Sequence, residues 1–377
     1  MKKKYFTLLF AVVASYGMIN AEVVNGTCGD NLTWSFNTES GLLSIEGSGM
    51  MNDYYYGFHG YWNEAPEAPW KAYATQIQTI TLPVGLSSIG SGAFQDCSVI
   101  QSIVIPNSVQ TIGKGAFCRC KSLQSIILGT GVQSVQTGAF IECENLLSVS
   151  FNQQLTKIEE MAFAFCKKLN SIAFQNDLRE IEENAFQDCV ALTSITFPNS
   201  LITLNGFYGC TGITSIVVPN SVTRIGGDAF ADCNNLSSLI IGSGVESIGA
   251  NAFYACSGLT SVTCLATTPP RMSLEYSVQP CDGCAEPLIE EDIEESSPVF
   301  EDVVCYNIPL YVPAESIKAY QHTDQWKEFD PIQAIQNSEG IEDVLSDQVQ
   351  CTKSIRDGQI FILRGDKTYT LQGQEVK

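Results

Sequence analysis

Apolar residues recur at a fixed spacing through the middle of the chain, and one position of the pattern is always cysteine. An alanine and a phenylalanine (glycine and phenylalanine in one copy) stand four and three residues before it, and an aliphatic residue stands three residues after it. The spacing is 23 residues with a single step of 21, and this cysteine column is Cys97, Cys120, Cys143, Cys166, Cys189, Cys210, Cys233 and Cys256. A pattern of this length in eight copies predicts a solenoid over residues 77–264.

Each unit is expected to contain three elements, as residues 222–241 illustrate. The first is a short extended piece, 222–226, whose Val222 and Ile225 point inward. The second is a compact turn, 228–233, which suits a single helical turn. The third is a strand, 237–241, whose apolar residues alternate and face the core of a parallel sheet. Because one unit cannot offset its own ordering cost, neighbouring units must cover both of its faces.

The outward positions of the predicted strands form two uncharged columns. The serine column is Ser102, Ser125, Ser148, Ser171, Ser194, Ser215, Ser238 and Ser261. The neighbouring column is Val104, Ile127, Ser150, Ala173, Thr196, Val217, Ile240 and Thr263. Because solenoids bind through the extended face of their sheet, one interpretation is a docking surface for a protein or a glycan.

The other interpretation of these columns is that serine is a small residue that packs easily along a crowded sheet. The sequence does not separate the two. As partner-binding residues we predict the whole serine column together with Val104, Ile127, Thr196, Val217 and Ile240.

Fifteen cysteines in an exported chain would ordinarily indicate a disulfide framework. Stacked equivalent positions, however, lie ~4.8 Å apart with parallel side chains, slightly beyond the ~3.5–4.5 Å between Cβ atoms that a disulfide needs. We therefore expect the cysteine column to consist of packed thiols. The cysteines left as candidates for pairing are Cys28, Cys118, Cys264, Cys281, Cys284, Cys305 and Cys351.

The first 21 residues have the pattern of a secretory signal peptide. A lysine-rich start, an apolar run over 5–13 and a small-residue cleavage site at 19–21 support this prediction. A membrane anchor is the alternative, but the run is shorter than the ~20 residues of a spanning helix. No later segment has the length and apolarity of a spanning helix. We expect an exported protein with no membrane-spanning segment after signal removal.

Residues 22–76 do not repeat and are expected to form an N-terminal cap. Alternation over 33–37 and 41–45 around a turn predicts a β-hairpin. An aromatic cluster follows, made of Tyr54, Tyr55, Tyr56, Phe58, Tyr61, Trp62, Trp70 and Tyr73. These rings either close the open end of the solenoid, which we favour, or form a platform on which sugars stack.

Residues 265–337 are expected to contain an acidic insertion, roughly 266–304, and a C-terminal cap. The carboxylates between Glu286 and Glu301 suggest a calcium site or a solvated loop, and we favour the loop because no Asp-rich calcium motif is present. Cys281 and Cys284 have the spacing of a zinc half-site or a redox pair, but a loop disulfide is the favoured interpretation. We predict no metal and no cofactor.

The end of the chain is predicted to be a linker, 338–350, and a tail, 351–377. Within the tail, 358–363 and 368–372 indicate a short hairpin whose turn contains Arg364, Gly365 and Asp366. Arg-Gly-Asp is also an adhesion tripeptide, although a turn explains it equally well.

The repeat resembles a known family once its positions are written together. The pattern Val-x-x-Ile-Gly-x-x-Ala-Phe-x-x-Cys-x-x-Leu-x-x-Ile-x-Ile-Pro is similar to the BspA-like leucine-rich repeats of bacterial surface proteins, and it covers about half of the chain. Segments 26–34 and 310–329 resemble the usual caps of such proteins, and the tail resembles Bacteroidetes sorting tails. The resemblance implies a β-rich, right-handed leucine-rich-repeat superhelix. The 21-residue repeat ending at Cys210 and the long insertion depart from the family pattern.

Charge and chemistry exclude several functions. The net charge is −21 and no basic patch is present, so nucleic acid is not an expected partner. The two histidines, His59 and His322, lie in opposite caps, and no nucleophile elbow, metalloprotease motif or phosphate loop occurs. The pairs Glu159-Glu160 and Glu182-Glu183 could mimic glycosidase carboxylates, but repetition of the unit explains them better. We predict that the chain is not an enzyme.

Three functions remain. The resemblance implies an adhesion or interaction protein at the cell surface, which would bind a host matrix protein or a bacterial surface protein and stand on the outer surface of a Gram-negative bacterium. A glycan-binding protein that uses the aromatic cluster is the second hypothesis. A structural surface component without a discrete ligand is the third.

Overall fold

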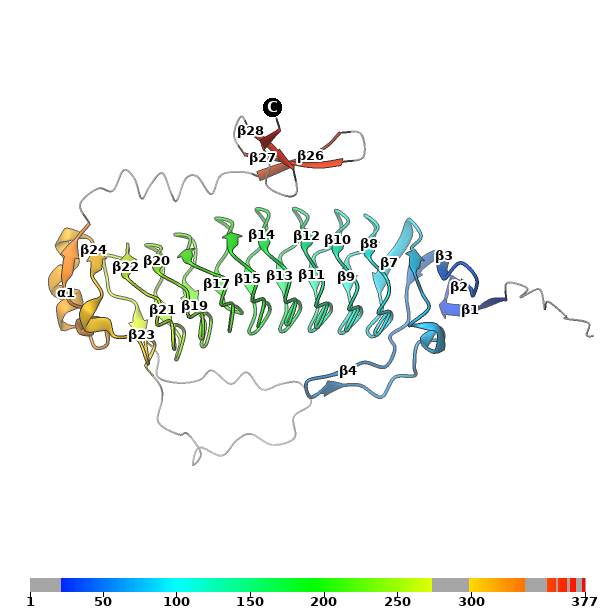
Figure 1. Ribbon diagram of the computed structural model, residues 1–377, viewed down its shortest axis with the longest axis horizontal. Coiled ribbons are helices and arrows are strands. Elements are labelled where there is room, and N and C mark those ends of the chain that lie inside the picture. Colours follow the sequence, from blue (N-terminus) through cyan, green and yellow to red (C-terminus); the bar gives the residue numbers. More distant parts are fainter. Residues whose placement is uncertain are drawn as a thin grey trace, which may run out of the picture.

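The computed structural model describes residues 22–272 and 298–335, and the backbone of four strands between 351 and 376. The signal peptide, the acidic run and the pair Cys281 and Cys284, the linker, and the Gly-Asp of the Arg-Gly-Asp turn lie outside the described residues. The repeats form one elongated β-rich solenoid with the N-terminal strands at one end and helix α1 (Ile317–His322) at the other (Figure 1). The predicted fold class is confirmed.

The strands that end each repeat lie side by side in parallel and define what we call the strand face. They are β8 (Ser102–Val104), β10 (Ser125–Ile127), β12 (Ser148–Ser150), β14 (Ser171–Ala173), β16 (Ser194–Thr196), β18 (Ser215–Val217), β20 (Ser238–Ile241) and β22 (Ser261–Cys264). Their hydrogen bonding is interrupted after β12 and again after β16. The strand face is therefore three hydrogen-bonded segments, and not the single parallel sheet that the pattern suggested.

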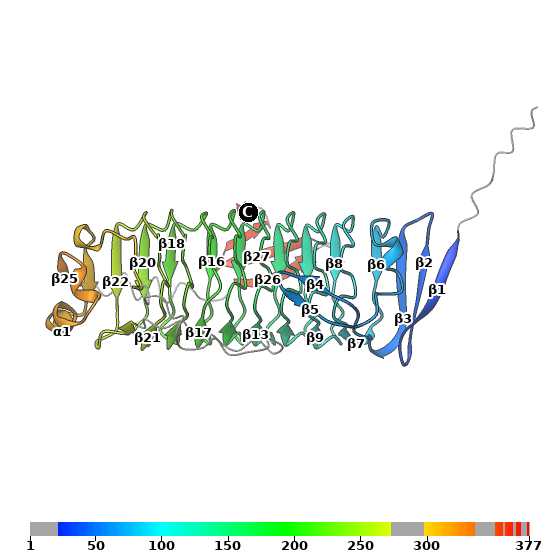
Figure 2. The same ribbon diagram turned by 90° about the horizontal axis from the view of Figure 1, so that it is seen from below.

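The short extended pieces form a second sheet, which is the longest of the molecule (Figure 2). Its parallel strands are β7 (Gly85–Ile89), β9 (Thr111–Ile112), β11 (Ser134–Val135), β13 (Lys157–Ile158), β15 (Glu180–Ile181), β17 (Thr203–Leu204), β19 (Arg224–Ile225), β21 (Ser247–Ile248) and β23 (Arg271–Met272). As predicted, Val222 and Ile225 are fully buried. The sequence pattern did not indicate that these pieces pair continuously.

The compact turns are not helical turns, and this prediction was wrong. In the repeat around Phe230, Asp228 and Asp232 adopt left-handed φ angles of 51° and 58°, which interrupt a helix. The backbone N–H of Phe230 donates to the carbonyl of Ala252 in the next repeat at 2.8 Å. Asp228 and Asp232 also donate sideways, whereas Ala231 and Cys233 donate to the carbonyl three residues back in the same turn. Because alternate N–H groups bond to the neighbouring repeat, a continuous helical pattern does not form.

The core is built from stacked columns. The phenylalanine column is Phe94, Phe117, Phe140, Phe163, Phe186, Phe207, Phe230, Phe253 and Phe300. Beside it all eight cysteines of the column are buried and free, as predicted. The thiol of Cys120 donates to the carbonyl of Phe94 one repeat earlier, at 3.3 Å, and the same contact recurs along the column. The short repeat loses its two residues within the turn, so Phe207 still stacks on Phe186 at 5.2 Å.

The pattern of the repeats continues into the N-terminal cap. Strands β1 (Val23–Gly29), β2 (Leu32–Asn37) and β3 (Leu42–Met50) form an antiparallel meander that includes the predicted hairpin. The end of β3 then pairs in parallel with β7, and β6 (Thr79–Thr81) pairs with the start of β3. After the 3₁₀ helix η1 (Lys71–Tyr73) the chain enters the first repeat. Trp70 stacks on Phe94 and occupies the phenylalanine position of an additional turn.

The pattern also continues beyond Cys264. Phe300 stacks on Phe253 at 5.2 Å, and β24 (Leu310–Val312) pairs in parallel with β22. The remaining elements are η3 (Cys305–Asn307), η4 (Ala314–Ser316), α1, η5 (Trp326–Glu328) and β25 (Ile332–Ala334). Tyr320 and Trp326 are fully buried in this closing segment. Parallel pairing thus extends past 77–264 at both ends.

The tail contains more strands than the predicted hairpin. Strands β26 (Cys351–Arg356), β27 (Gln359–Arg364), β28 (Lys367–Thr370) and β29 (Glu375–Val376) form one antiparallel sheet, in which β27 and β28 are the predicted pair. Throughout the described part of the chain, no helix combines the length and apolarity needed to cross a membrane.

Candidate functional site

The strand face presents the serine column to solvent. Ser102, Ser125 and Ser148 are directly paired in register, as are the serines of the other two segments. None of the eight serines is buried, whereas the residue after each, such as Ile103, points into the core. The other predicted site residues are also on the solvent side, and Val104 is 61% exposed. The structure therefore gathers all thirteen predicted residues on one face, while their role in binding stays a prediction.

The absence of charge is a property of the strand face and not of the molecule as a whole. The outward column of the second sheet is Ser88, Thr111, Ser134, Lys157, Glu180, Thr203, Arg224, Ser247 and Arg271. Lys157 there forms ion pairs with Glu180 at 3.4 Å and Glu182 at 2.6 Å. A partner of the strand face would meet small hydroxyl and aliphatic groups, which are cheaper to desolvate than ions.

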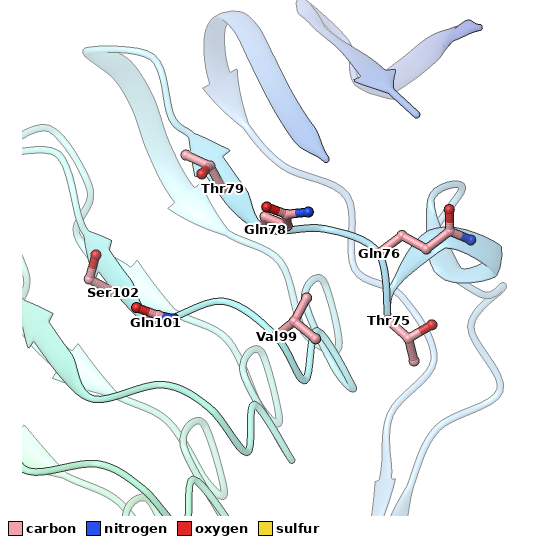
Figure 3. Close-up of a pocket in the computed structure, with 7 residues that line it drawn as sticks. All are labelled: Thr75, Gln76, Gln78, Thr79, Val99, Gln101 and Ser102. Carbon is pink, nitrogen blue, oxygen red and sulfur yellow. The ribbon is translucent and has the colours of Figure 1, made fainter. Parts of the chain in front are cut away.

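A cleft of about 600 Å³ lies at the N-terminal end of the strand face, between β6 and β8 (Figure 3). Thr75, Gln76, Gln78 and Thr79 come from one chain segment, and Val99, Gln101 and Ser102 come from the next. Ser102 is thus shared by the cleft and the serine column. Sequence reasoning missed the cleft, because it depends on which strands pair.

The aromatic cluster divides into three groups. Tyr54 and Trp70 are buried at the end of the core, where each ring contacts the next, as a cap requires. Tyr56 and Phe58 are also buried, but against Cys118, Ile141 and Ala164 on the outside of the repeats. Trp62 is 69% exposed.

Residues 54–64, which we call the arm, cross the turns of the first repeats (Figure 2). The arm carries strands β4 (Gly57–Phe58) and β5 (Tyr61–Trp62). The hydroxyl of Tyr61 donates to a carboxylate oxygen of Glu160 at 2.6 Å, and burial together with this bond raises the pKa of Tyr61. Arg119 donates to the carbonyl of Gly57 at 3.0 Å. The arm is therefore attached by packing and by hydrogen bonds over several repeats.

The sequence contains a signal for the position of the arm. The residue before the alanine of a turn has a left-handed φ. It is glycine in the first three turns that the arm crosses (Gly92, Gly115 and Gly138) and Met161, which packs against the arm, in the fourth. Later turns have larger residues at this position, such as Asn184 and Asn251. A Cβ atom on Gly138 would lie 2.2 Å from the ring of Phe58. The three glycines thus mark turns over which another segment lies.

The thiols are unreactive groups in the described part of the chain. Burial raises the pKa of Cys97 from 9.0 to about 12, and the pKa of Cys256 likewise. Four of the cysteines considered for pairing, Cys28, Cys118, Cys264 and Cys305, are buried and free. The side chains of the other three are outside the described residues.

The groups considered for catalysis have structural partners. His59 lies 3.3 Å from a carboxylate oxygen of Glu142, and the Nδ1 of His322 is 2.6 Å from the carbonyl of Lys318. Glu159 accepts hydrogen bonds from the hydroxyls of Ser134 and Thr137.

The other carboxylates of the two glutamate pairs are used in the same way. Glu182 accepts from the backbone of Glu160 at 3.1 Å. Glu183 instead lies at the surface, where partial desolvation and the neighbouring carboxylates of Glu160 and Asp228 raise its pKa. Within residues 22–272 and 298–335, no group of three or more acidic, cysteine or histidine side chains is arranged to hold a metal ion.

Comparisons with known proteins identify the family of the repeat. A family model described as the BspA type Leucine rich repeat region matches six copies, over residues 72–193 and 136–260, about half of the chain. No curated protein matches the chain.

Several solved structures are similar to this chain. A leucine-rich repeat protein of T. pallidum is 31% identical over 46% of this chain and 76% of its own, with a TM-score of 0.37. One from Bacteroides ovatus ATCC 8483 is 20% identical over 82% of this chain and 99% of its own, with a TM-score of 0.37. A leucine rich cell surface protein of Faecalibacterium prausnitzii A2-165 is 20% identical over 64% and 94%, with a TM-score of 0.23. These low TM-scores add nothing to the functional argument.

Proposed function

Because the chain belongs to the BspA-type leucine-rich-repeat family, we propose that it is an exported cell-surface protein that binds a protein partner through its strand face. Leucine-rich-repeat solenoids are typically interaction proteins without enzymatic activity, and their extended faces are their usual binding surfaces. The partner would be a host matrix protein or a protein of another bacterial surface. Export and the location on the outer surface of a Gram-negative bacterium rest on the sequence of residues 1–21 and of the tail.

The observation that carries this proposal is the contrast between the two sheets. The strand face keeps two columns of small or aliphatic side chains over eight repeats, in a protein of net charge −21. The second sheet, made by the same repeats, carries Lys157, Glu180 and Arg224 at outward positions. Because both sheets belong to the same repeats, this contrast supports a binding role for the strand face.

The test introduces charge on the strand face. A variant with Ser148, Ser171 and Ser194 changed to lysine places three cations in the middle of the serine column. We expect it to lose binding to host matrix proteins immobilised on a surface, because each ammonium group would have to be desolvated or would repel a fitted partner. Binding of the full chain and the variant would be compared by surface plasmon resonance.

The matched control changes the same number of residues to lysine on the second sheet, at Thr111, Thr203 and Ser247. Lys157 already occupies an equivalent position, so the substitution suits that sheet. If the control variant loses binding as strongly as the strand-face variant, the proposal is wrong. Circular dichroism of both variants would establish that they remain folded.

A second candidate is glycan binding by the arm. Trp62 is 69% exposed and Tyr55 38% exposed, while Tyr54, Phe58 and Trp70 are buried and serve packing. An exposed indole is a suitable surface for a sugar ring. This candidate predicts sugar binding that Trp62→Ala abolishes and that the lysine variants of the strand face leave unchanged.

A further inference from the structure

The cleft between β6 and β8 is a preformed feature of the backbone. β6 pairs with β3, whereas β8 pairs with β10, and no strand pairing joins β6 to β8 among the described residues. One repeat later, the N–H of Gln124 donates to the carbonyl of Gln101 at 2.8 Å, but the N–H of Gln78 donates to Gly41 in the cap. Because β6 pairs with β3 of the cap, β6 does not join the strand face. The resulting gap does not depend on a side-chain rotamer.

The groups that line the cleft are polar and uncharged. They comprise three carboxamides, three hydroxyls and the side chain of Val99, which is 36% exposed. In the described part of the chain, the side-chain carboxamides of Gln76, Gln78 and Gln101 have no hydrogen-bond partner. Each carboxamide offers two donors and an acceptor. Such a set suits a ligand whose groups both donate and accept.

Charge decides which class of polar ligand fits. An anion would enter a protein of net charge −21 without a cation to receive it, and a cation would find no carboxylate in the lining. Sugar hydroxyls donate and accept at neighbouring atoms, and the apolar face of a sugar ring can contact Val99. The volume of about 600 Å³ falls within the ~300–1,000 Å³ of small-molecule sites.

We propose that this cleft binds a short neutral oligosaccharide, independently of any protein bound along the strand face. The site is open to solvent and lacks an aromatic ring in its lining, so binding is weak, with a Kd of roughly 1 mM. The protein thus has a small-molecule subsite at the N-terminal end of its strand face.

The experiment measures saturation transfer from the full chain to neutral trisaccharides by NMR. Maltotriose, cellotriose and chitotriose are the neutral probes, and sialyllactose and triglycine are the anionic and peptide probes. We expect signal for at least one neutral trisaccharide. Changing Gln101 to alanine should raise the Kd of that trisaccharide by roughly 5- to 10-fold, which corresponds to one or two lost hydrogen bonds. The matched control is Gln124→Ala, which removes the same exposed side chain from the next repeat, outside the cleft.

Each result has a defined meaning. No transfer to any neutral trisaccharide, or an equal loss in Gln101→Ala and Gln124→Ala, overturns the proposal. A stronger signal from sialyllactose or triglycine overturns the assignment to a neutral saccharide, and loss in Trp62→Ala moves the site to the arm. The triple lysine variant at Ser148, Ser171 and Ser194 leaves the cleft unchanged, so it should retain sugar binding even if protein binding fails.

Discussion

At the residue scale, the column of cysteines is the most distinctive feature of the molecule. Each thiol is buried between stacked repeats, and the seven after Cys97 donate to a phenylalanine carbonyl one repeat earlier, as Cys143 does to Phe117 at 3.3 Å. Burial disfavours the thiolate, which is the reactive form. Cysteine therefore serves here as a small apolar residue with a weak donor, and not as a disulfide or a nucleophile.

The raised pKa values predict a stability that falls at high pH. A buried thiol stays neutral while the same thiol in the unfolded chain ionises above about pH 9. The stabilisation is thus fully present below that pH and is lost as pH rises toward the folded pKa of about 12 for Cys97 and Cys256. Each thiol contributes a slope of roughly 1.4 kcal/mol per pH unit in this range. Urea unfolding at a series of pH values measures how the free energy of unfolding changes with pH.

The control for this prediction is a double variant, Cys97→Ala and Cys256→Ala. Its free energy of unfolding should be lower at neutral pH because two buried side chains are smaller, but it should fall less steeply above pH 9. Identical pH dependence in the variant and the parent chain would mean that the thiols are not the groups that titrate.

At the element scale, the arm shows how a cap segment uses the regularity of the repeats. Three of the turns beneath it have glycine at one position, and the ring of Phe58 lies over Gly115 and Gly138. The surrounding residues Cys118, Ile141 and Ala164 are apolar, and Gln95 accepts a hydrogen bond from the backbone N–H of Gly57. The two-residue strands β4 and β5 are stabilised because the repeats beneath them supply an apolar surface.

Changing Gly138 to asparagine should release the arm without unfolding the solenoid. Asparagine occupies the equivalent position at Asn184 and Asn251 with the same left-handed φ, so the turn tolerates it. Its side chain would occupy the place of the Phe58 ring. We expect faster hydrogen exchange in residues 54–64 and a nearly unchanged thermal transition of the solenoid, measured by mass spectrometry and circular dichroism.

Two further variants provide a second test and a control for this prediction. Phe58→Ala removes the same contact from the other side and should release the arm equally, at a cost of about 3–5 kcal/mol in local stability. Trp62→Ala alters an exposed ring and should leave exchange in the arm as it is. Protection of the arm in both Gly138→Asn and Phe58→Ala would show that the polar contacts to Glu160 and Arg119 suffice.

At the scale of the whole molecule, the solenoid is a stack in which each turn contacts its two neighbours. Ring follows ring from Trp70 to Phe300, and Phe300 then meets Trp326 in the closing segment. Stability in such a stack is a sum of nearest-neighbour terms.

Nearest-neighbour stability predicts that the place of a mutation decides which repeats open. Trp70→Ala should remove about 3–5 kcal/mol and expose the first repeats to hydrogen exchange, while the repeats beyond Phe230 remain protected. Phe163→Ala should reduce protection on both sides of the centre. Uniform loss of protection along the whole solenoid in Trp70→Ala would indicate two-state unfolding instead.

The net charge of −21 predicts a response to salt. Self-repulsion of like charges opposes the compact state, and ions screen it over the Debye length of ~10 Å at 0.1 M. Adding sodium chloride should raise Tm, and a similar increase should follow neutralisation of carboxylates at mildly acidic pH. A Tm that falls with added salt would indicate that favourable ion pairs, such as Lys157 with Glu182, outweigh the repulsion.

The sequence by itself determined the repeat, its buried columns and the outward direction of the serine column. These features are local and periodic, so the information in a unit such as 222–241 is repeated eight times along the chain. The free state of the cysteine column also followed from the spacing of stacked strands alone. The family assignment rests on the same pattern.

Only the tertiary structure decided which strands pair and what lies over the turns. The sideways bonding of Phe230 to Ala252 replaced the expected helical turn, and the pairing of β6 with β3 opened the cleft. The position of Phe58 over Gly138 joins residues 80 apart in the chain. Such contacts depend on how the caps meet the repeats, and because each cap occurs once, no repetition in the sequence reveals its pairing.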